Sequence, residues 1–274
     1  MTSTLLLVLY AAAAISYVVF FTRRSASAGR ASTLLLSAAV LTHTFVIGMH
    51  TMQVGYAPFV GQSAAISTFV WLLALAYLYT EFSTEERSMG TFIVPLLAIL
   101  QIIPTINPRL VERPPELQSP LLAFHVTSLL FAYASFALAC VIGITYVLLF
   151  KEIKAKHLGY FYARLPSLQV LDVMNVRAIT IGWIFLTIGV AVGILWARQV
   201  AGAADDPRLQ AMTLFDPKIF VALICWVVYS FEMFATRAIG WRGRRTAWLS
   251  TLGFAIVLLN FLPVSYFLTR SHNF

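Results

Sequence analysis

Charged residues are scarce in this sequence. Only 11% of its 274 residues are Asp, Glu, Lys or Arg, whereas 60% are hydrophobic. Soluble globular domains carry about 25% charged residues, which keep their surfaces hydrated. The composition therefore excludes an ordinary soluble domain and indicates an integral membrane protein.

Cysteine is also rare, with only Cys140 and Cys225 present. Each cysteine lies inside an apolar run, and the two do not form a C-x-x-C pair, so the sequence indicates neither a disulfide framework nor a thiol-redox motif. The formal net charge of +8 does not indicate nucleic-acid binding. The basic residues lie in short loops between apolar runs, where they set membrane topology.

Long apolar runs dominate the chain. A helix needs about 20 mainly apolar residues to cross a hydrocarbon core about 30 Å thick. The sequence contains about eight such runs, at residues 4–22, 33–54, 66–82, 90–106, 120–150, 178–198, 217–236 and 247–269. We therefore predict an all-α, polytopic membrane helix bundle forming a single transmembrane domain over residues 1–274.

The basic residues predict the orientation of this bundle. If the runs alternate in direction, most of the 19 basic residues fall on one side, namely Arg23, Arg24, Arg30, Arg87, Lys151, Lys154, Lys156, Arg164, Arg177, Arg237, Arg242, Arg244 and Arg245. Basic loops stay on the cytoplasmic side. We therefore expect both termini on the outer, periplasmic side, and a multi-pass location in a bacterial inner membrane.

Two histidines are predicted at the outer face. His125 lies at the outer end of the fifth run, and His272 lies just beyond the outer end of the eighth. Two neutral imidazoles at the same membrane depth suit an iron held from both faces of a porphyrin. The alternative is that His125 anchors a helix end while His272 lies in a frayed tail.

Other polar residues have simpler interpretations. His43 lies near mid-membrane, where it is either a functional residue or an interhelical hydrogen-bonding group. Asp216 and Pro217 have the pattern of a helix start, with Asp216 as N-cap. We expect Glu81 and Glu232 to be explained by water or by pairing with Arg237, and we assign no catalytic residue.

Several segments resemble the CcsA/CcmC/HemX-like cytochrome c assembly family, whose members handle heme. The resemblance lies in residues 165–172, 182–189, 193–197, 215–226 and 240–245, in the Gly253-Phe254 and Asn260-Phe261 pairs, and in the closing His272. It implies an outer aromatic loop that holds heme, flanked by two iron-ligating histidines. By position these are His125 and His272, and Trp196, Phe215, Asp216 and Trp226 belong to the loop or border it.

The sequence departs from the family pattern in its aromatic residues. Phe215 replaces a tryptophan, Val221 stands where the family often has another, and residues 201–213 contain none. Some members bind a second heme inside the membrane, and His43 resembles one of its ligands. The partner ligand would fall near Phe234 or Ala235, so that axial pair is incomplete.

The resemblance implies heme binding and presentation for cytochrome c assembly. The expected partner is an apocytochrome c or a companion assembly subunit, and we expect a heme-handling component rather than a self-sufficient heme lyase. The alternative is a non-catalytic structural or regulatory subunit of a larger membrane complex, with weak heme binding or none.

Overall fold

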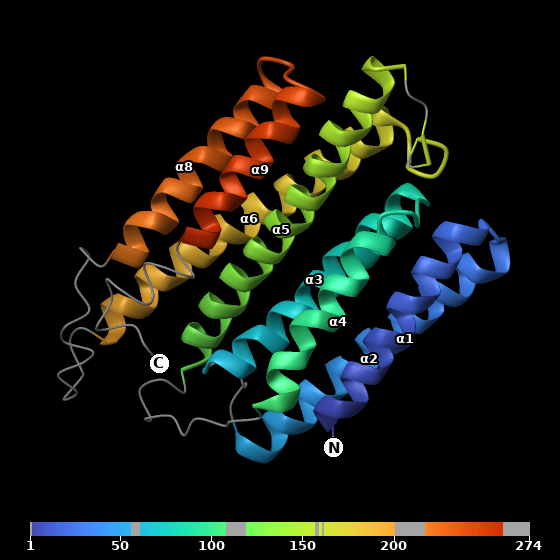
Figure 1. The fold of residues 1–274 in the computed structure, drawn as a ribbon. Coiled ribbons are helices and arrows are strands. Elements are labelled where there is room, and N and C mark those ends of the chain that lie inside the picture. Colours follow the sequence, from blue (N-terminus) through green and yellow to red (C-terminus); the bar gives the residue numbers. More distant parts are fainter. Residues whose placement is uncertain are drawn as a thin grey trace.

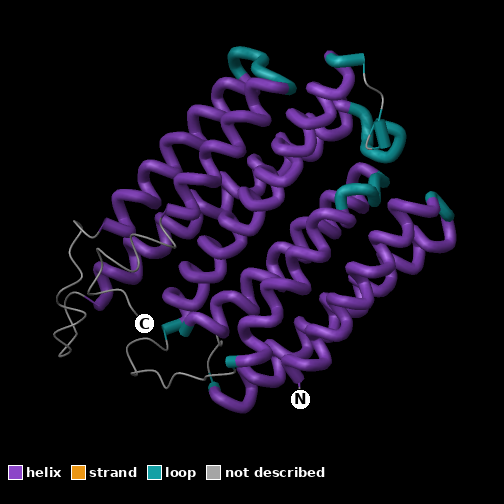
Figure 2. The backbone as a smooth tube through the Cα atoms, in the orientation of Figure 1, coloured by secondary structure: helices purple, strands orange, loops and turns teal. Residues whose placement is uncertain are grey.

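The computed structural model describes residues 2–55, 61–107, 119–156, 159–160, 162–200 and 217–259. Within these ranges the chain forms eight helices and no strand (Figure 1; Figure 2). The helices are α1 (Thr2–Arg23), α2 (Ala26–Val54), α3 (Gln62–Thr84), α4 (Gly90–Ile106), α5 (Pro120–Lys154), α6 (Leu168–Val200), α8 (Pro217–Arg237) and α9 (Arg244–Leu259).

Six of these helices, α1, α2, α3, α5, α6 and α8, are long and apolar enough to cross a membrane. The apolar helix α4 has 17 residues and contains Pro95 and Pro104, and α9 is described over 16 residues. The predicted all-α, polytopic bundle is therefore confirmed, and the chain is a multi-pass membrane protein. The side that each terminus faces stays a prediction.

Several helices extend beyond the apolar runs that predicted them. Helix α2 begins at Ala26 rather than at residue 33, and α6 begins at Leu168 rather than at residue 178. The 35 residues of α5 span about 50 Å at 1.5 Å per residue, well beyond the hydrocarbon thickness. The polar ends of these helices therefore continue the helix outside the apolar layer.

The helices form two groups of four, and consecutive helices run in opposite directions (Figure 1). One group contains α1 to α4, and the other contains α5, α6, α8 and α9. Helix α5 packs extensively against α6 and also against α9, while the main contact between the groups joins α3 to α5. Helix α5 is thus central to the second group and also borders the first.

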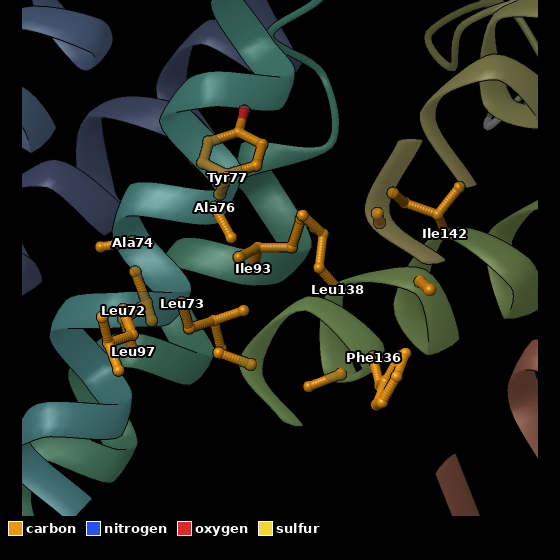
Figure 3. Close-up of a cluster of buried hydrophobic side chains, with 14 of the residues drawn as sticks. Leu72, Leu73, Ala74, Ala76, Tyr77, Ile93, Leu97, Phe136, Leu138 and Ile142 are labelled. Carbon is orange, nitrogen blue, oxygen red and sulfur yellow. The ribbon is translucent and has the colours of Figure 1, made fainter. Parts of the chain in front are cut away.

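Apolar side chains fill the space between the two groups. Leu73 of α3 and Ile93 of α4 lie toward Leu138 of α5 in Figure 3, and all three are buried. Such side chains pack closely and without directional bonds. The two groups therefore meet within the membrane through nonpolar contact.

Glycines allow α5 and α6 to approach closely. A Cβ atom built on Gly189 would lie 2.8 Å from Leu129 Cδ2, and one built on Gly182 would lie 2.4 Å from Phe136 Cε1. Both distances are too short for a real Cβ atom, so neither position accepts a larger residue without movement. Small residues at helix contacts are a common packing device in membranes.

Arginines tie the two groups together at one end of the bundle. Arg164 Nε donates to the carbonyl oxygen of Phe21 at 3.1 Å, and Arg177 Nη1 donates to that of Ser83 at 2.7 Å. These carbonyls belong to the last turns of α1 and α3, which lack helical donors. We call this end, where the predicted inner loops lie, the basic end.

Candidate functional site

His125 lies in the second turn of α5, and α5 begins at the end of the bundle opposite the basic end (Figure 1). Its Nδ1 atom is 2.7 Å from the carbonyl oxygen of Gly189 in α6. Because a carbonyl only accepts, Nδ1 carries the proton, and the lone pair of the neutral imidazole is on Nε2. This is the tautomer that a histidine uses when Nε2 binds a metal and Nδ1–H binds a supporting carbonyl.

Gly193 fixes how closely the imidazole approaches α6. A Cβ atom at this position would lie 2.5 Å from His125 Cε1 and 2.6 Å from Nδ1. The imidazole therefore occupies the space that any larger residue would need. The hydrogen bond to Gly189 and the contact with Gly193 together hold the ring against one face of α6.

Trp196 shares this face of α6. It follows Gly193 by three residues, about one helical turn, and only 6% of its surface is exposed. Its indole Nε1 is buried and has no hydrogen-bond acceptor among the described residues. An indole N–H is a donor that normally finds a partner when buried, so this position offers a donor for a bound acceptor.

Trp226 lies on the other side of α6. It is in the third turn of α8, and its Nε1 donates to Thr187 Oγ1 at 3.0 Å. Thr187 and Gly189 are about 200° apart around α6 at 3.6 residues per turn. The structure therefore brings His125 and Trp196 to one face of α6 and places the Trp226 contact on the opposite face.

His43 is buried between three helices. Its Nδ1 lies 3.1 Å from the hydroxyl oxygen of Tyr10 in α1, and its Nε2 lies 3.0 Å from Ser67 Oγ in α3. Both ring nitrogens therefore have hydroxyl partners. The geometry is that of the interhelical hydrogen bonding considered from the sequence.

The remaining predicted site residues, His272, Phe215 and Asp216, lie outside the described residues. Helix α8 is described from Pro217 onward, so the predicted N-cap at Asp216 stays a prediction. Within the described part of the chain, no three His, Cys, Asp or Glu side chains are grouped so that they could hold a metal ion. His125 is therefore a single candidate iron ligand, and its pairing with His272 stays a prediction.

The expectation that Glu232 contacts water or pairs with Arg237 was wrong. Glu232 is fully buried and accepts from Ser250 Oγ at 2.7 Å, rather than meeting water or Arg237. Asn175 Nδ2 of α6 donates to the same Ser250 hydroxyl at 2.9 Å. Within the described residues, Glu232 Oε2, Asn175 Oδ1 and the Tyr229 hydroxyl are buried without partners. A polar cluster thus joins α6, α8 and α9, and the sequence pattern did not reveal it.

Glu81 is likewise buried rather than exposed to water. Tyr17 donates to its Oε2 at 2.6 Å, Thr33 donates to its Oε1 at 2.5 Å, and Arg87 Nε lies 3.6 Å from Oε1. The carboxylate therefore has a hydrogen-bonded and charged environment that connects α1, α2 and α3. This satisfied arrangement is typical of a structural group.

The fold and the His125 environment define a polytopic helical membrane protein with an imidazole held at one end of the bundle. The sequence pattern of the family described as "Cytochrome C assembly protein" matches residues 3–272. The chain belongs to this family.

Individual relatives are named cytochrome c biogenesis protein CcsA. The protein from Guillardia theta is 26% identical over 266 residues, covering 90% of this chain and 85% of the relative. The protein from Synechococcus sp. (strain CC9902) is 22% identical over 267 residues, covering 88% of this chain and 85% of the relative. The similarity thus extends over nearly the full length of both chains.

Proposed function

We propose that this chain binds heme at the end of the bundle where α5 begins and presents it for cytochrome c assembly. His125 and His272 would hold the heme iron. The membrane is the cytoplasmic membrane of a bacterium, and the heme end faces outward. The observation that carries the proposal is the His125 Nδ1–Gly189 hydrogen bond of 2.7 Å in a member of the cytochrome c assembly family.

The residues around His125 fit a heme. The Nδ1–H bond to Gly189 orients the ring and makes Nε2 a better iron ligand. Trp196 supplies a buried N–H without an acceptor in the described chain, and a heme propionate is a suitable acceptor. We assign Phe215 to the flat aromatic wall and Asp216 to capping of α8, and we assign Trp226 to the support of α6 from its opposite face.

The chemistry requires little of the protein itself. When bound, heme supplies the vinyl groups to which the thiols of an apocytochrome c add. This chain binds the iron, orients the macrocycle and provides a docking end for the apocytochrome or a companion subunit. Because the apocytochrome supplies the thiols, the chain needs no nucleophile of its own.

We do not assign His43 to the proposed heme site. Ligation of an intramembrane heme would require it to give up its bond to Tyr10 or to Ser67. We therefore place the functional heme at His125 and treat the His43 contacts as the means by which α1, α2 and α3 are joined.

The test is the absorption spectrum of the purified full-length chain. We expect a Soret band, and we expect His125→Gly to lower heme affinity by roughly tenfold or more, because an iron ligand is lost. Added imidazole should restore the band, since it replaces the missing ligand in the space left by the side chain. His272→Gly should behave in the same way.

His50→Gly is the matched control, because it removes an imidazole of α2 to which we assign no iron. A spectrum that stays unchanged in both His125→Gly and His272→Gly would exclude the ligand assignment. A folded chain without a Soret band would instead support the structural or regulatory subunit, which the replacement residues Phe215 and Val221 favour.

A further inference from the structure

A surface pocket of about 840 Å³ lies at the basic end, where the loop between α8 and α9 meets the first turns of α9. Its lining includes three arginines and two tryptophans, namely Arg242, Arg244, Arg245, Trp241 and Trp248. The link between α8 and α9 lies at the opposite end of the bundle from the start of α5 (Figure 1), where His125 lies. The proposed heme site therefore does not account for the pocket.

The loop that forms the pocket has a defined conformation. Trp241 N–H donates to the carbonyl oxygen of Ala235 at 2.9 Å, across the end of α8. Gly243 N–H donates to Asp172 Oδ1 of α6 at 2.7 Å, and the positive φ of Gly243 (68°) is one that glycine adopts without strain. These bonds fix the conformation of the loop backbone that carries the arginines.

The pocket carries an excess of positive charge. Arg242 Nη1 lies 3.6 Å from Asp172 Oδ2, which partly balances that arginine. The Arg245 guanidinium lies over the ring of Trp241, 5.5 Å from its centroid, and the Arg244 guanidinium lies 5.8 Å from the centroid of Phe150. Neither has a carboxylate partner among the described residues. Both side chains can therefore bind an anion.

An apolar stripe continues from these arginines along α9. Arg245, Trp248 and Leu252 are spaced by three and four residues and so share one helix face. Trp248 is 43% exposed and Leu252 is 57% exposed. In a membrane-spanning protein this face passes from a charged end to an apolar surface that contacts lipid chains.

We propose that this pocket binds an anionic phospholipid of the inner leaflet. Arg244 and Arg245 bind the headgroup phosphate, and the glycerol and upper acyl chain lie on Trp248 and Leu252. Basic pockets at the cytoplasmic end of membrane helices suit such headgroups, and tryptophan favours the interface depth. A free phosphate would use the arginines but would leave the apolar stripe without a role.

The test is native mass spectrometry of the full-length chain titrated with phosphatidylglycerol or with phosphatidylcholine. We expect tighter binding of phosphatidylglycerol, and we expect the double variant Arg244→Gln/Arg245→Gln to weaken it roughly 25-fold, or about fivefold for each arginine. The matched control is Arg23→Gln/Arg30→Gln, which removes two exposed arginines of the same end outside the pocket. Its affinity should stay unchanged.

Two further measurements separate a lipid from a soluble anion. Trp248→Ala should weaken phosphatidylglycerol binding, and glycerol phosphate at equal concentration should compete poorly. Equal preference for both lipids in the wild-type chain would overturn the proposal, even if the double variant failed to fold. Equal competition by glycerol phosphate would also overturn it, because the site would then be one for soluble anions.

Discussion

At the scale of single residues, the described part of the candidate site depends on how α5 and α6 are rotated against each other. The sequence placed His125 near a helix end, which the structure confirms. It did not predict the hydrogen bond to Gly189, because that partner is 64 positions away along the chain. Hydropathy predicts membrane depth, but it does not predict which face of one helix meets which face of the next.

The Glu232 cluster shows the same limit. Ser250 and Asn175 are ordinary polar residues in their own helices, and only packing brings them to Glu232. A buried carboxyl group in a membrane costs free energy unless it is hydrogen-bonded or neutral. The sequence analysis had expected Glu232 to contact water or Arg237, and it did not predict this buried cluster.

Substitution of Glu232 tests whether the stability of the fold depends on the hydrogen-bond acceptor of this side chain or on its negative charge. Glu232→Gln keeps the acceptor for Ser250, so we expect a change below about 1 kcal/mol in unfolding free energy. Glu232→Ala loses the acceptor and creates a cavity, which should cost about 1–3 kcal/mol. Thermal unfolding in detergent, followed by circular dichroism, measures both, with exposed Glu85→Gln as control. An equal loss in the Gln and Ala variants would show that the charge is required.

At the scale of helices, the apolar runs predicted every helix that the structure describes. The runs predicted the starts of α2 and α6 several residues too late, because these helices begin at Ala26 and Leu168. Those first turns are polar extensions that hydropathy does not count. Membrane thickness limits the apolar part of a helix, whereas capping and packing decide where the helix ends. The helix count was therefore predictable, and the helix lengths were not.

The contact between α5 and α6 gives a prediction for Gly182. An added Cβ would lie 2.4 Å from Phe136 Cε1, and Phe136 is stacked on Tyr229 with ring centroids 3.5 Å apart. Because Phe136 has little room to move, Gly182→Ala should destabilise the fold by about 1–3 kcal/mol. Chemical unfolding in detergent gives this value.

Gly48→Ala provides the matched control for Gly182. It lies within α2, and nothing lies within 4 Å of its built Cβ. This change should be neutral or stabilise the helix by up to about 1 kcal/mol. Equal effects of the two alanines would contradict the close contact between α5 and α6.

At the scale of the whole molecule, the alternating helices place the basic end opposite the His125 end (Figure 1). The positive-inside rule predicts that the basic end faces the cytoplasm. This orientation is a property of the protein in its membrane, and the arrangement of the helices alone does not fix it.

Cysteine labelling tests the orientation. In a background carrying Cys140→Ala and Cys225→Ala, Gln62→Cys at the start of α3 should react with a membrane-impermeant maleimide in intact cells. Ser27→Cys at the start of α2 should react only after the cells are permeabilised. Both positions are exposed, and the reverse pattern would invert the topology and place His125 inside.

The two groups of helices are joined differently along their length and at the basic end. Leu73, Ile93 and Leu138 meet along a nonpolar surface, whereas Arg164 and Arg177 make directional bonds at the basic end. Nonpolar surfaces tolerate sliding, and directional bonds resist it. Relative motion of the two groups would therefore pivot about the arginines of the basic end, and the widest gap would open beside the start of α5.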